Sequence, residues 1–346
     1  MCATKTNPGR FFEDYEVGQT LIHAVPRTVS GGERALYHSY YPARHAIYSS
    51  DEFARACGLA QSPLDDLAGF HVVFGKTVPD VSLNALANLG YAEGLFLKPI
   101  EIGDTLRSVS DVIGVKKNSN GKSGVVWVHT KGFNQRDEVV IEFKRWVMVR
   151  TKTPDADAPT TVIPALANAL TADQLVIPTG LDFSNYDFAL AGEPHRLRDY
   201  EVGEKIDHVD GTTIEETEHM IATRLWQNTS KVHFDVAARA GNPRLIYGGH
   251  VISLARTLSF NGLANAQMIA GINAGAHVNP CMAGDTVRAW SEVLETAETG
   301  APGVGAIRLR LVATKGEVGD MDLRDGAGKY QSGTLLDLDY WALMPL

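Results

Sequence analysis

A polar cluster followed by a pair of glycines holds the residue types in this sequence that could do chemistry. The cluster consists of Asn228, Ser230, His233 and Asp235. The imidazole of His233 can take and return protons near neutral pH, and the amide of Asn228 can hold a water molecule by hydrogen bonds. Gly248-Gly249 opens an expected helix, where bare backbone N–H groups at the positive end suit a developing oxyanion. The stretch therefore predicts acid–base chemistry beside a carbonyl group.

Two helices are expected to position this cluster. A short one covers residues 236–240, and the simpler interpretation of Asp235 is that it caps the start of this helix. The second follows the glycine pair and carries apolar residues at the spacing of one helix face. Its stripe consists of Val251, Leu254, Ala255 and Leu258. A stripe of this kind packs on a core, so the second helix should be buried.

An internal repeat organises the rest of the chain. Residues 12–18 recur as 197–203, residues 53–58 as 236–241, residues 98–107 as 279–288, and residues 144–148 as 339–343. Because the matches keep the same order, they indicate a duplication. We expect one copy over residues 1–152, a second copy over 196–346, and a linker rich in Pro, Ala, Asp and Thr over 153–195.

Each copy ends in segments whose apolar residues alternate, which is typical of strands. The expected strands cover residues 106–115, 124–133 and 139–149 in the first copy, and 287–294, 307–313 and 335–343 in the second. A helical middle precedes them in both copies. The pattern predicts an α+β fold in which an antiparallel sheet wraps a central helix, twice over. A short surface helix is expected over residues 165–175 of the linker.

Composition excludes several classes of function. A net charge of −9 disfavours nucleic acid as a partner, and no apolar run reaches the length of a membrane span. The three cysteines, Cys2, Cys57 and Cys281, are scattered without metal spacing and suit a reducing cytoplasm. The first residues lack the apolar core of a secretion signal, so a cytoplasmic protein is expected. Dinucleotide, Walker and zinc-protease motifs are missing, so no nucleotide fold or metal site is expected.

The motif residues resemble those of the MaoC-like R-specific enoyl-CoA hydratases, whose motif reads Gly-Asp-x-Asn-Pro-φ-His-x-Asp. The resemblance rests on Asn228-x-Ser230-Lys231-Val232-His233-x-Asp235, on Tyr247-Gly248-Gly249-His250 and on Pro280-x-x-x-Gly284-Asp285-Thr286. Residues 4–14 and 40–50 look most like the mesaconyl-CoA (2-methylfumaryl-CoA) hydratases, also called β-methylmalyl-CoA dehydratases. The resemblance covers nearly the whole chain apart from the linker. It implies a tandem (double) hotdog fold, a CoA thioester as substrate with no further cofactor, and a homodimer.

The chain departs from the family motif at positions that matter for the chemistry. Asn228 occupies the place of the catalytic Asp, and Ser230 and Lys231 occupy those of the Asn and Pro. In the first copy Ser50 falls opposite His233, so the motif is lost there unless His45 enters the site. One working site for each chain is therefore expected, with the first half supplying pocket walls.

The resemblance assigns roles that compete with simpler ones. His233 is expected to transfer protons, although a core histidine bonded to a backbone carbonyl is the alternative. Asn228 would hold water or orient substrate, or else be a turn residue. The N–H of Gly249, beside Gly248, would receive the oxyanion, or Gly249 would merely allow close helix packing. Asp235 is a helix cap first and a replacement for the missing Asp second.

A substrate with a second carboxylate needs a fork-shaped cation, and Arg44 is the candidate. The further expected substrate contacts are Tyr40, His45, Ser230 and Gly248. A surface ion pair is the alternative for Arg44. The predicted reaction is reversible hydration of mesaconyl-CoA to β-methylmalyl-CoA. The alternatives are a general R-specific enoyl-CoA hydratase, a hotdog thioesterase with a carboxylate aimed at water, and a non-catalytic acyl-CoA-binding double hotdog.

Overall fold

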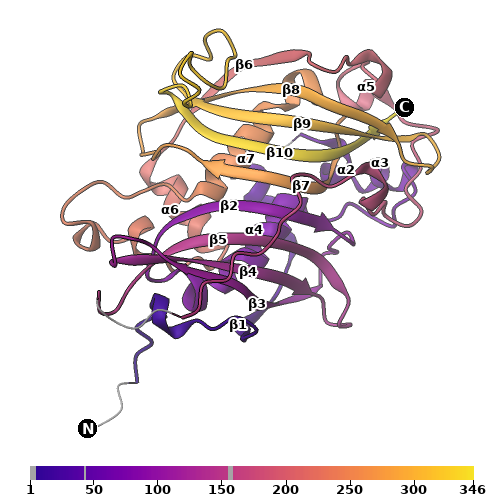
Figure 1. Ribbon diagram of the computed structural model, residues 1–346. Coiled ribbons are helices and arrows are strands. Elements are labelled where there is room, and N and C mark those ends of the chain that lie inside the picture. The colour runs from indigo at the N-terminus through magenta and orange to yellow at the C-terminus, as the bar shows by residue number, and fades with distance from the viewer. Residues whose placement is uncertain (1–4, 43, 155–158) are drawn as a thin grey trace.

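A computed structural model describes residues 5–42, 44–154 and 159–346. Cys2, the start of the 4–14 lead-in and residues 155–158 of the expected linker lie outside the described residues. A ten-stranded antiparallel sheet runs through both halves in the order β1-β3-β4-β5-β2-β7-β10-β9-β8-β6 (Figure 1). None of the helices in the described ranges is long and apolar enough to cross a membrane.

The two halves repeat one arrangement of strands around one central helix. The first half contains β1 (Thr20–Thr28), α4 (Asp66–Thr77), β2 (Ala85–Phe96), β3 (Thr105–Lys117), β4 (Ser123–Phe133) and β5 (Val139–Arg150). The second contains β6 (Lys205–Thr213), α7 (Gly248–Leu258), β7 (Met268–His277), β8 (Thr286–Glu298), β9 (Val304–Lys315) and β10 (Thr334–Pro345). This is the α+β architecture that the repeat predicts.

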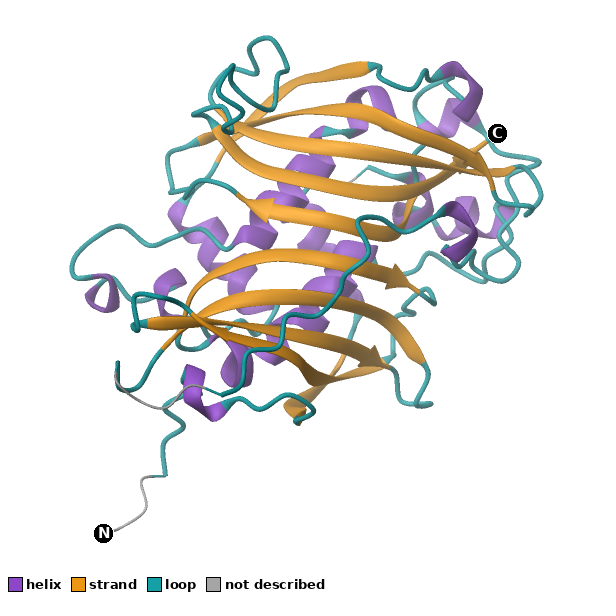
Figure 2. Ribbon diagram, in the orientation of Figure 1, coloured by secondary structure: helices purple, strands orange, loops and turns teal. Residues whose placement is uncertain are grey.

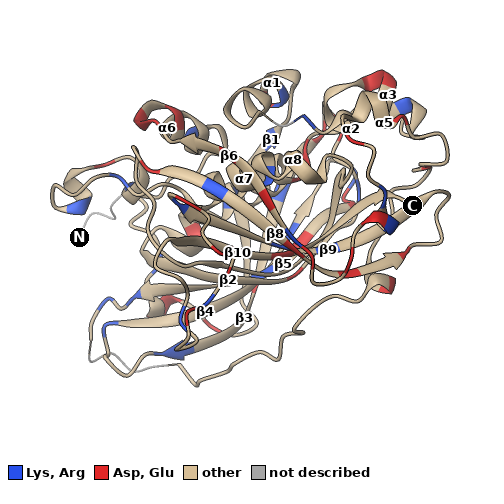
Figure 3. Ribbon diagram, turned by 90° about the horizontal axis from the view of Figure 1, so that it is seen from above, with Lys and Arg blue, Asp and Glu red and all other residues tan. Residues whose placement is uncertain are grey.

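The remaining helices are shorter. They are α1 (Gly31–Tyr40), α2 (Ala46–Ser49), α3 (Asp51–Ala56), α5 (Phe188–Ala191), α6 (Glu216–Leu225) and α8 (Phe260–Leu263). Single helical turns occur at Phe12–Asp14, Val78–Ser82, Ala172–Gln174, Leu197–Asp199, Lys231–His233 and Ala237–Arg239. Helices α1, α6, α7 and α8 lie on one side of the sheet (Figure 3).

The sheet and the two central helices enclose the core between them. Every side chain of α4 is buried, and α7 is buried from Gly249 to Leu258. Strands β2 and β7 pair directly, with Tyr91 opposite Gly275 and Leu95 opposite Gly271, so the halves share one sheet. A site between the halves can therefore draw residues from both copies.

The six expected strands are confirmed within a few residues of their bounds. The expected helix at 165–175 is wrong, because only the turn Ala172–Gln174 is helical. Backbone N–H groups of this segment instead donate to side chains of the sheet, Ala167 to Glu93 and Leu170 to Asn273. The segment crosses the outer face of the sheet as an extended connection (Figure 2). The expected helix at 236–240 is a single turn that ends at Ala240 in the left-handed conformation.

Candidate active site

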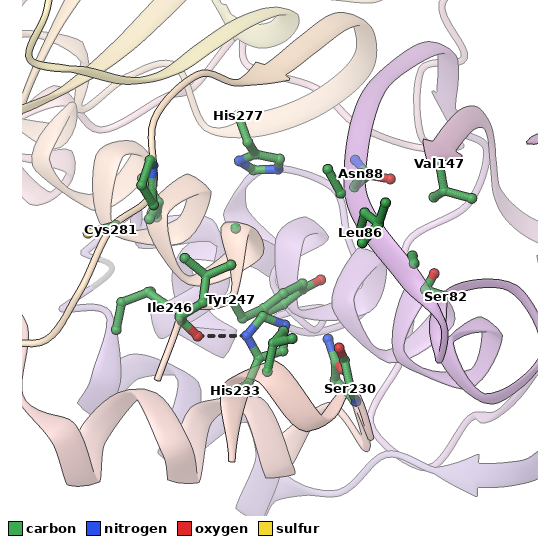
Figure 4. A pocket seen from close by; sticks show the side chains of 18 of the residues that line it. Ser82, Leu86, Asn88, Val147, Ser230, His233, Ile246, Tyr247, His277 and Cys281 are labelled. Atoms are coloured by element: carbon green, nitrogen blue, oxygen red, sulfur yellow. Dashed lines mark hydrogen bonds between the residues drawn. The ribbon is translucent and has the colours of Figure 1, made fainter. Parts of the chain in front are cut away.

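A pocket of about 250 Å³ lies between the two halves of the chain. The first half lines it with the end of α4, the turn after α4, and strands β2 and β5. The second half lines it with residues 228–233, residues 245–248, the start of α7, and the end of β7 with the segment after it. Asn228, Ser230 and His233 of the polar cluster thus meet Gly248 at one cavity, and Figure 4 shows Ser230 and His233 there.

His233 lies in this pocket with one ring nitrogen engaged and the other open. His233 is the last residue of the turn Lys231–His233, and its Nδ1 lies 2.7 Å from the carbonyl oxygen of Leu245. A carbonyl oxygen only accepts, so Nδ1 carries the hydrogen and Nε2 presents a lone pair. Nε2 has no hydrogen-bond partner among the described residues. Burial lowers the pKa of His233 to about 4, so the imidazole is neutral at neutral pH and Nε2 can act as a base.

Asn228 joins two roles that the sequence leaves as alternatives. The side chain is 4% exposed, and its Oδ1 accepts from the backbone N–H of Ser230 at 3.0 Å, which is the turn role. The same side chain lines the pocket, where its Nδ2 donates to none of the residues that the structure describes. The Nδ2 of Asn228 is therefore a hydrogen-bond donor that remains available to a ligand.

The two functions considered for Gly249, oxyanion binding and close packing, belong to different residues of the glycine pair. Gly248 lines the pocket and Gly249 does not. A methyl group on Gly249 would lie 2.4 Å from the Tyr247 ring and 2.6 Å from that of His71, so this glycine allows close packing. The backbone N–H groups of both glycines lack partners within the described ranges, whereas that of His250 donates to the carbonyl of Tyr247. The donor that borders the pocket is Gly248.

Several residues expected at the site line other surfaces. Asp235 is exposed, and its Oδ1 accepts from the N–H of Ala237, as a cap does. Arg44 is exposed and lies 4.3 Å from the centre of the Phe260 ring, and the buried ring of His45 also contacts Phe260. Tyr40 packs against the ring of Tyr41. Arg44 and His45 therefore pack against α8, and neither they nor Tyr40 line the pocket.

The structure adds pocket residues that sequence reasoning missed. His277 ends β7, and its Nε2 lies 3.3 Å from the hydroxyl of Tyr91. Burial lowers the pKa of His277 to about 4. The internal repeat carries a signal for it, because His277 replaces Phe96 of the first copy. Arg145, on β5, is the second missed residue and is fully buried in the pocket wall.

The electrostatics of the pocket are set by neutral imidazoles and one arginine. Its lining, as far as the structure describes the chain, includes no Asp or Glu. The carboxylate that a hotdog thioesterase would need is therefore missing from the described lining. No group of three or more His, Cys, Asp or Glu among the described residues is arranged to hold a metal ion.

Comparisons of the sequence with known proteins identify its family. The model of the mesaconyl-CoA hydratase family matches residues 2–319. The chain is 69% identical over 341 residues to a mesaconyl-CoA hydratase of Cereibacter sphaeroides and 55% identical over 348 residues to a beta-methylmalyl-CoA dehydratase of Chloroflexus aurantiacus. Each alignment covers 99% of both chains.

Solved structures agree on the fold. A putative MaoC domain dehydratase from Chloroflexus aurantiacus superimposes with a TM-score of 0.96 at 54% identity, covering 99% of both chains. A Mycobacterium tuberculosis protein described as a double hotdog aligns with a TM-score of 0.75 over 97% of this chain and 98% of its own, at 23% identity, and this likeness concerns the fold alone. The chain is a double hotdog, and it belongs to the mesaconyl-CoA hydratase family.

Proposed function

We propose that this protein adds water reversibly across the double bond of mesaconyl-CoA and forms β-methylmalyl-CoA. The names of the two relatives describe the two directions of this reaction. The observation that carries the mechanism is the neutral imidazole of His233, with Nδ1 bonded to Leu245 and Nε2 open to the pocket. The protein is thus a hydro-lyase that acts on a CoA thioester.

In the hydration direction, His233 Nε2 takes a proton from water while the water oxygen attacks the carbon β to the thioester. Asn228 Nδ2 donates a hydrogen bond that holds this water. The electron pair of the double bond moves toward the thioester oxygen, where the N–H of Gly248 stabilises the negative charge. The enolate then takes the proton back from His233 at the α carbon. Its negative charge is what makes a protonated His233 tolerable in a site that otherwise keeps this imidazole neutral.

The replacement His233→Ala tests this assignment. We expect kcat for mesaconyl-CoA, followed by the absorbance of the enoyl thioester, to fall about 1,000-fold, because general acid–base catalysis contributes roughly 100- to 10,000-fold. The control is His195→Ala, since His195 is exposed and outside the pocket lining. Turnover by His233→Ala close to wild type, with an unchanged melting temperature, would remove His233 from the reaction.

The same assay separates the other functions. Equal rates with crotonyl-CoA and mesaconyl-CoA would indicate a general enoyl-CoA hydratase, and release of free thiol would indicate a thioesterase. Binding of both thioesters without turnover would indicate a carrier protein.

The homodimer stays a prediction. The two opposite edge strands of the sheet each expose apolar side chains to which a second copy could bind, namely Ile22 and Val25 on β1 and Val209 on β6.

A further inference from the structure

Arg145 is a buried cation without a counter-ion. It lies on β5 in the pocket wall, it is 0% exposed, and the Phe74 ring lies 4.3 Å from its guanidinium carbon. No carboxylate of the described residues forms an ion pair with it, and its Nε–H has no partner there either. A charge buried without a partner is costly, so a protein that retains one is expected to obtain the opposite charge from elsewhere.

Arg145 orients the side chains of Asn88 and Ser82 so that their hydrogen-bond donors remain available to a ligand. Nη1 lies 3.3 Å from Oδ1 of Asn88, and Nη2 lies 3.0 Å from Oγ of Ser82. Because Asn88 accepts with its oxygen, its amide nitrogen must face elsewhere, and this buried Nδ2 has no partner in the described part of the chain. The Ser82 hydroxyl likewise accepts from Arg145 and keeps its hydrogen for another acceptor. Both residues line the pocket.

We propose that Arg145, together with Asn88 and Ser82, binds the free carboxylate of the substrate and thereby selects dicarboxylate thioesters. This inference rests on the proposed hydration of mesaconyl-CoA. A positive charge, an unpartnered amide and a hydroxyl hydrogen at one wall form a site for an anion, and the described lining holds no acidic side chain to compete for it. The remaining partner of Nη2, the Thr77 hydroxyl, is a neutral group, so it does not satisfy the charge.

The anchor also places the reacting atoms. In mesaconyl-CoA the free carboxylate is attached to the alkene carbon β to the thioester, which is the carbon that water attacks. Figure 4 shows Ser82 and Asn88 on the first half of the chain, and Ser230, His233 and His277 on the second. A substrate held by its carboxylate at Arg145 therefore presents its β carbon to the residues of the second half. The first copy, which lost the catalytic motif, supplies the specificity.

Arg145 takes the role that the sequence suggests for Arg44. The guanidinium of Arg44 is exposed and lies over Phe260, outside the pocket lining, whereas that of Arg145 is buried in the lining itself. The two arginines thus provide a matched pair of variants, Arg145→Met and Arg44→Met. Each removes one guanidinium and keeps a long side chain that can fill the space.

The experiment compares kcat/KM for mesaconyl-CoA and crotonyl-CoA. Crotonyl-CoA lacks the free carboxylate, and it also lacks the methyl group on the α carbon, so the effect of each variant is judged by the change in the ratio of the two values. We expect Arg145→Met to lower kcat/KM for mesaconyl-CoA roughly 100-fold while that for crotonyl-CoA stays within about threefold, because only the dicarboxylate loses a charged contact. Arg44→Met should leave the ratio of the two values unchanged. Equal losses on both substrates, or a ratio altered only by Arg44→Met, would overturn the proposal.

Two further measurements cover the case in which Arg145→Met does not fold. Asn88→Leu and Ser82→Ala leave the charge in place and should each lower the mesaconyl-to-crotonyl ratio roughly tenfold. Wild-type protein should bind succinyl-CoA at least about tenfold more tightly than butyryl-CoA by calorimetry. Equal affinities would contradict the anchor. Wild-type turnover of crotonyl-CoA alone would contradict the proposed substrate, whereas intact mesaconyl-CoA selectivity in Arg145→Met would contradict the anchor only.

Discussion

At the scale of single residues, the oxygen and the nitrogen of the Asn228 side-chain amide have different roles. Its oxygen supports the backbone of Ser230, and its nitrogen is free for a ligand. Asn228→Asp keeps the acceptor and removes the donor, whereas Asn228→Ala removes both. The two replacements therefore distinguish the two roles of one side chain.

We expect Asn228→Asp to keep the melting temperature near that of the wild type and to lower kcat roughly tenfold or more. The lost donor no longer holds the water, and the added negative charge opposes the enolate. Asn228→Ala should lower both kcat and the melting temperature, because the N–H of Ser230 loses its acceptor. A kcat for Asn228→Asp above that of the wild type would instead give position 228 the role of a proton acceptor.

Local motifs in the sequence predict those pocket residues that belong to one short stretch. They do not predict the pocket residues that come from distant parts of the chain. Asn228, Ser230, His233 and Gly248 share one segment, and the structure brings them together. Local composition suggests Arg44 and His45 for the site, but a distant ring, Phe260, determines where they pack. The position of Arg145 depends on the pairing of β5 with β2, which no local pattern reveals.

At the scale of elements, helix α4 of the first half supports the segment that carries the site in the second half. A methyl group on Gly75 of α4 would lie 1.8 Å from the carbonyl oxygen of Trp226 and 3.5 Å from the backbone nitrogen of Asn228. The helix and this backbone can approach each other only because the position has no side chain. The central helix of one copy therefore positions the catalytic segment of the other.

Gly75→Ala should destabilise the protein by several kcal/mol, or roughly the cost of an overpacked core, and should also lower kcat for mesaconyl-CoA. Denaturant unfolding and the absorbance assay measure the two effects. The matched control is Gly31→Ala at the exposed start of α1, where nothing lies within 4 Å and helix propensity favours alanine. Unchanged stability and activity in Gly75→Ala would show that this contact does not position the site.

The strands that join the halves are the elements that the sequence hides. Strands β2 and β7 are rich in Gly, Ala and Asn, which have low strand propensity, so no expected strand covers them. Their small residues instead leave room for large aromatic side chains of the neighbouring strands, and this packing favours the strand conformation. A methyl group on Gly90 would lie 2.4 Å from the Trp146 ring, and one on Gly275 would lie 2.9 Å from that of Tyr91. Tertiary packing overrides local preference at both positions.

At the scale of the whole molecule, the site belongs to a core that holds several histidines neutral. Burial lowers the pKa values of His71 and His250 to about 3, and those of His208, His233 and His277 to about 4. In the unfolded chain these groups take up protons near pH 6.5. Between pH 6.5 and 4 the unfolded state binds more protons than the folded state, so the histidines make the free energy of unfolding fall as the pH falls.

Two buried aspartates oppose this trend. Burial raises the pKa of Asp65 to about 6 and that of Asp66 to about 7, so their folded forms take up protons at a higher pH than the unfolded chain does. Their contribution to stability therefore grows as the pH falls from 7 toward 4. Since each unit of pKa shift is worth about 1.4 kcal/mol, the histidines lose on the order of 9 kcal/mol between pH 7 and 5, and the aspartates return about 4.

The net expectation is that the free energy of unfolding is lower by several kcal/mol at pH 5 than at pH 7, which melting temperatures measured at half-unit steps would reveal. His208→Gln tests the cause without touching the pocket, because His208 bonds the carbonyl oxygen of Asn261 and the hydroxyl of Ser291 and is not among the residues that line the pocket. Removing this titrating group should reduce the fall in the free energy of unfolding between pH 7 and 5 by about the contribution of one histidine. A melting temperature that rises between pH 7 and 5 would mean that the buried aspartates, and not the histidines, set the acid stability of this fold.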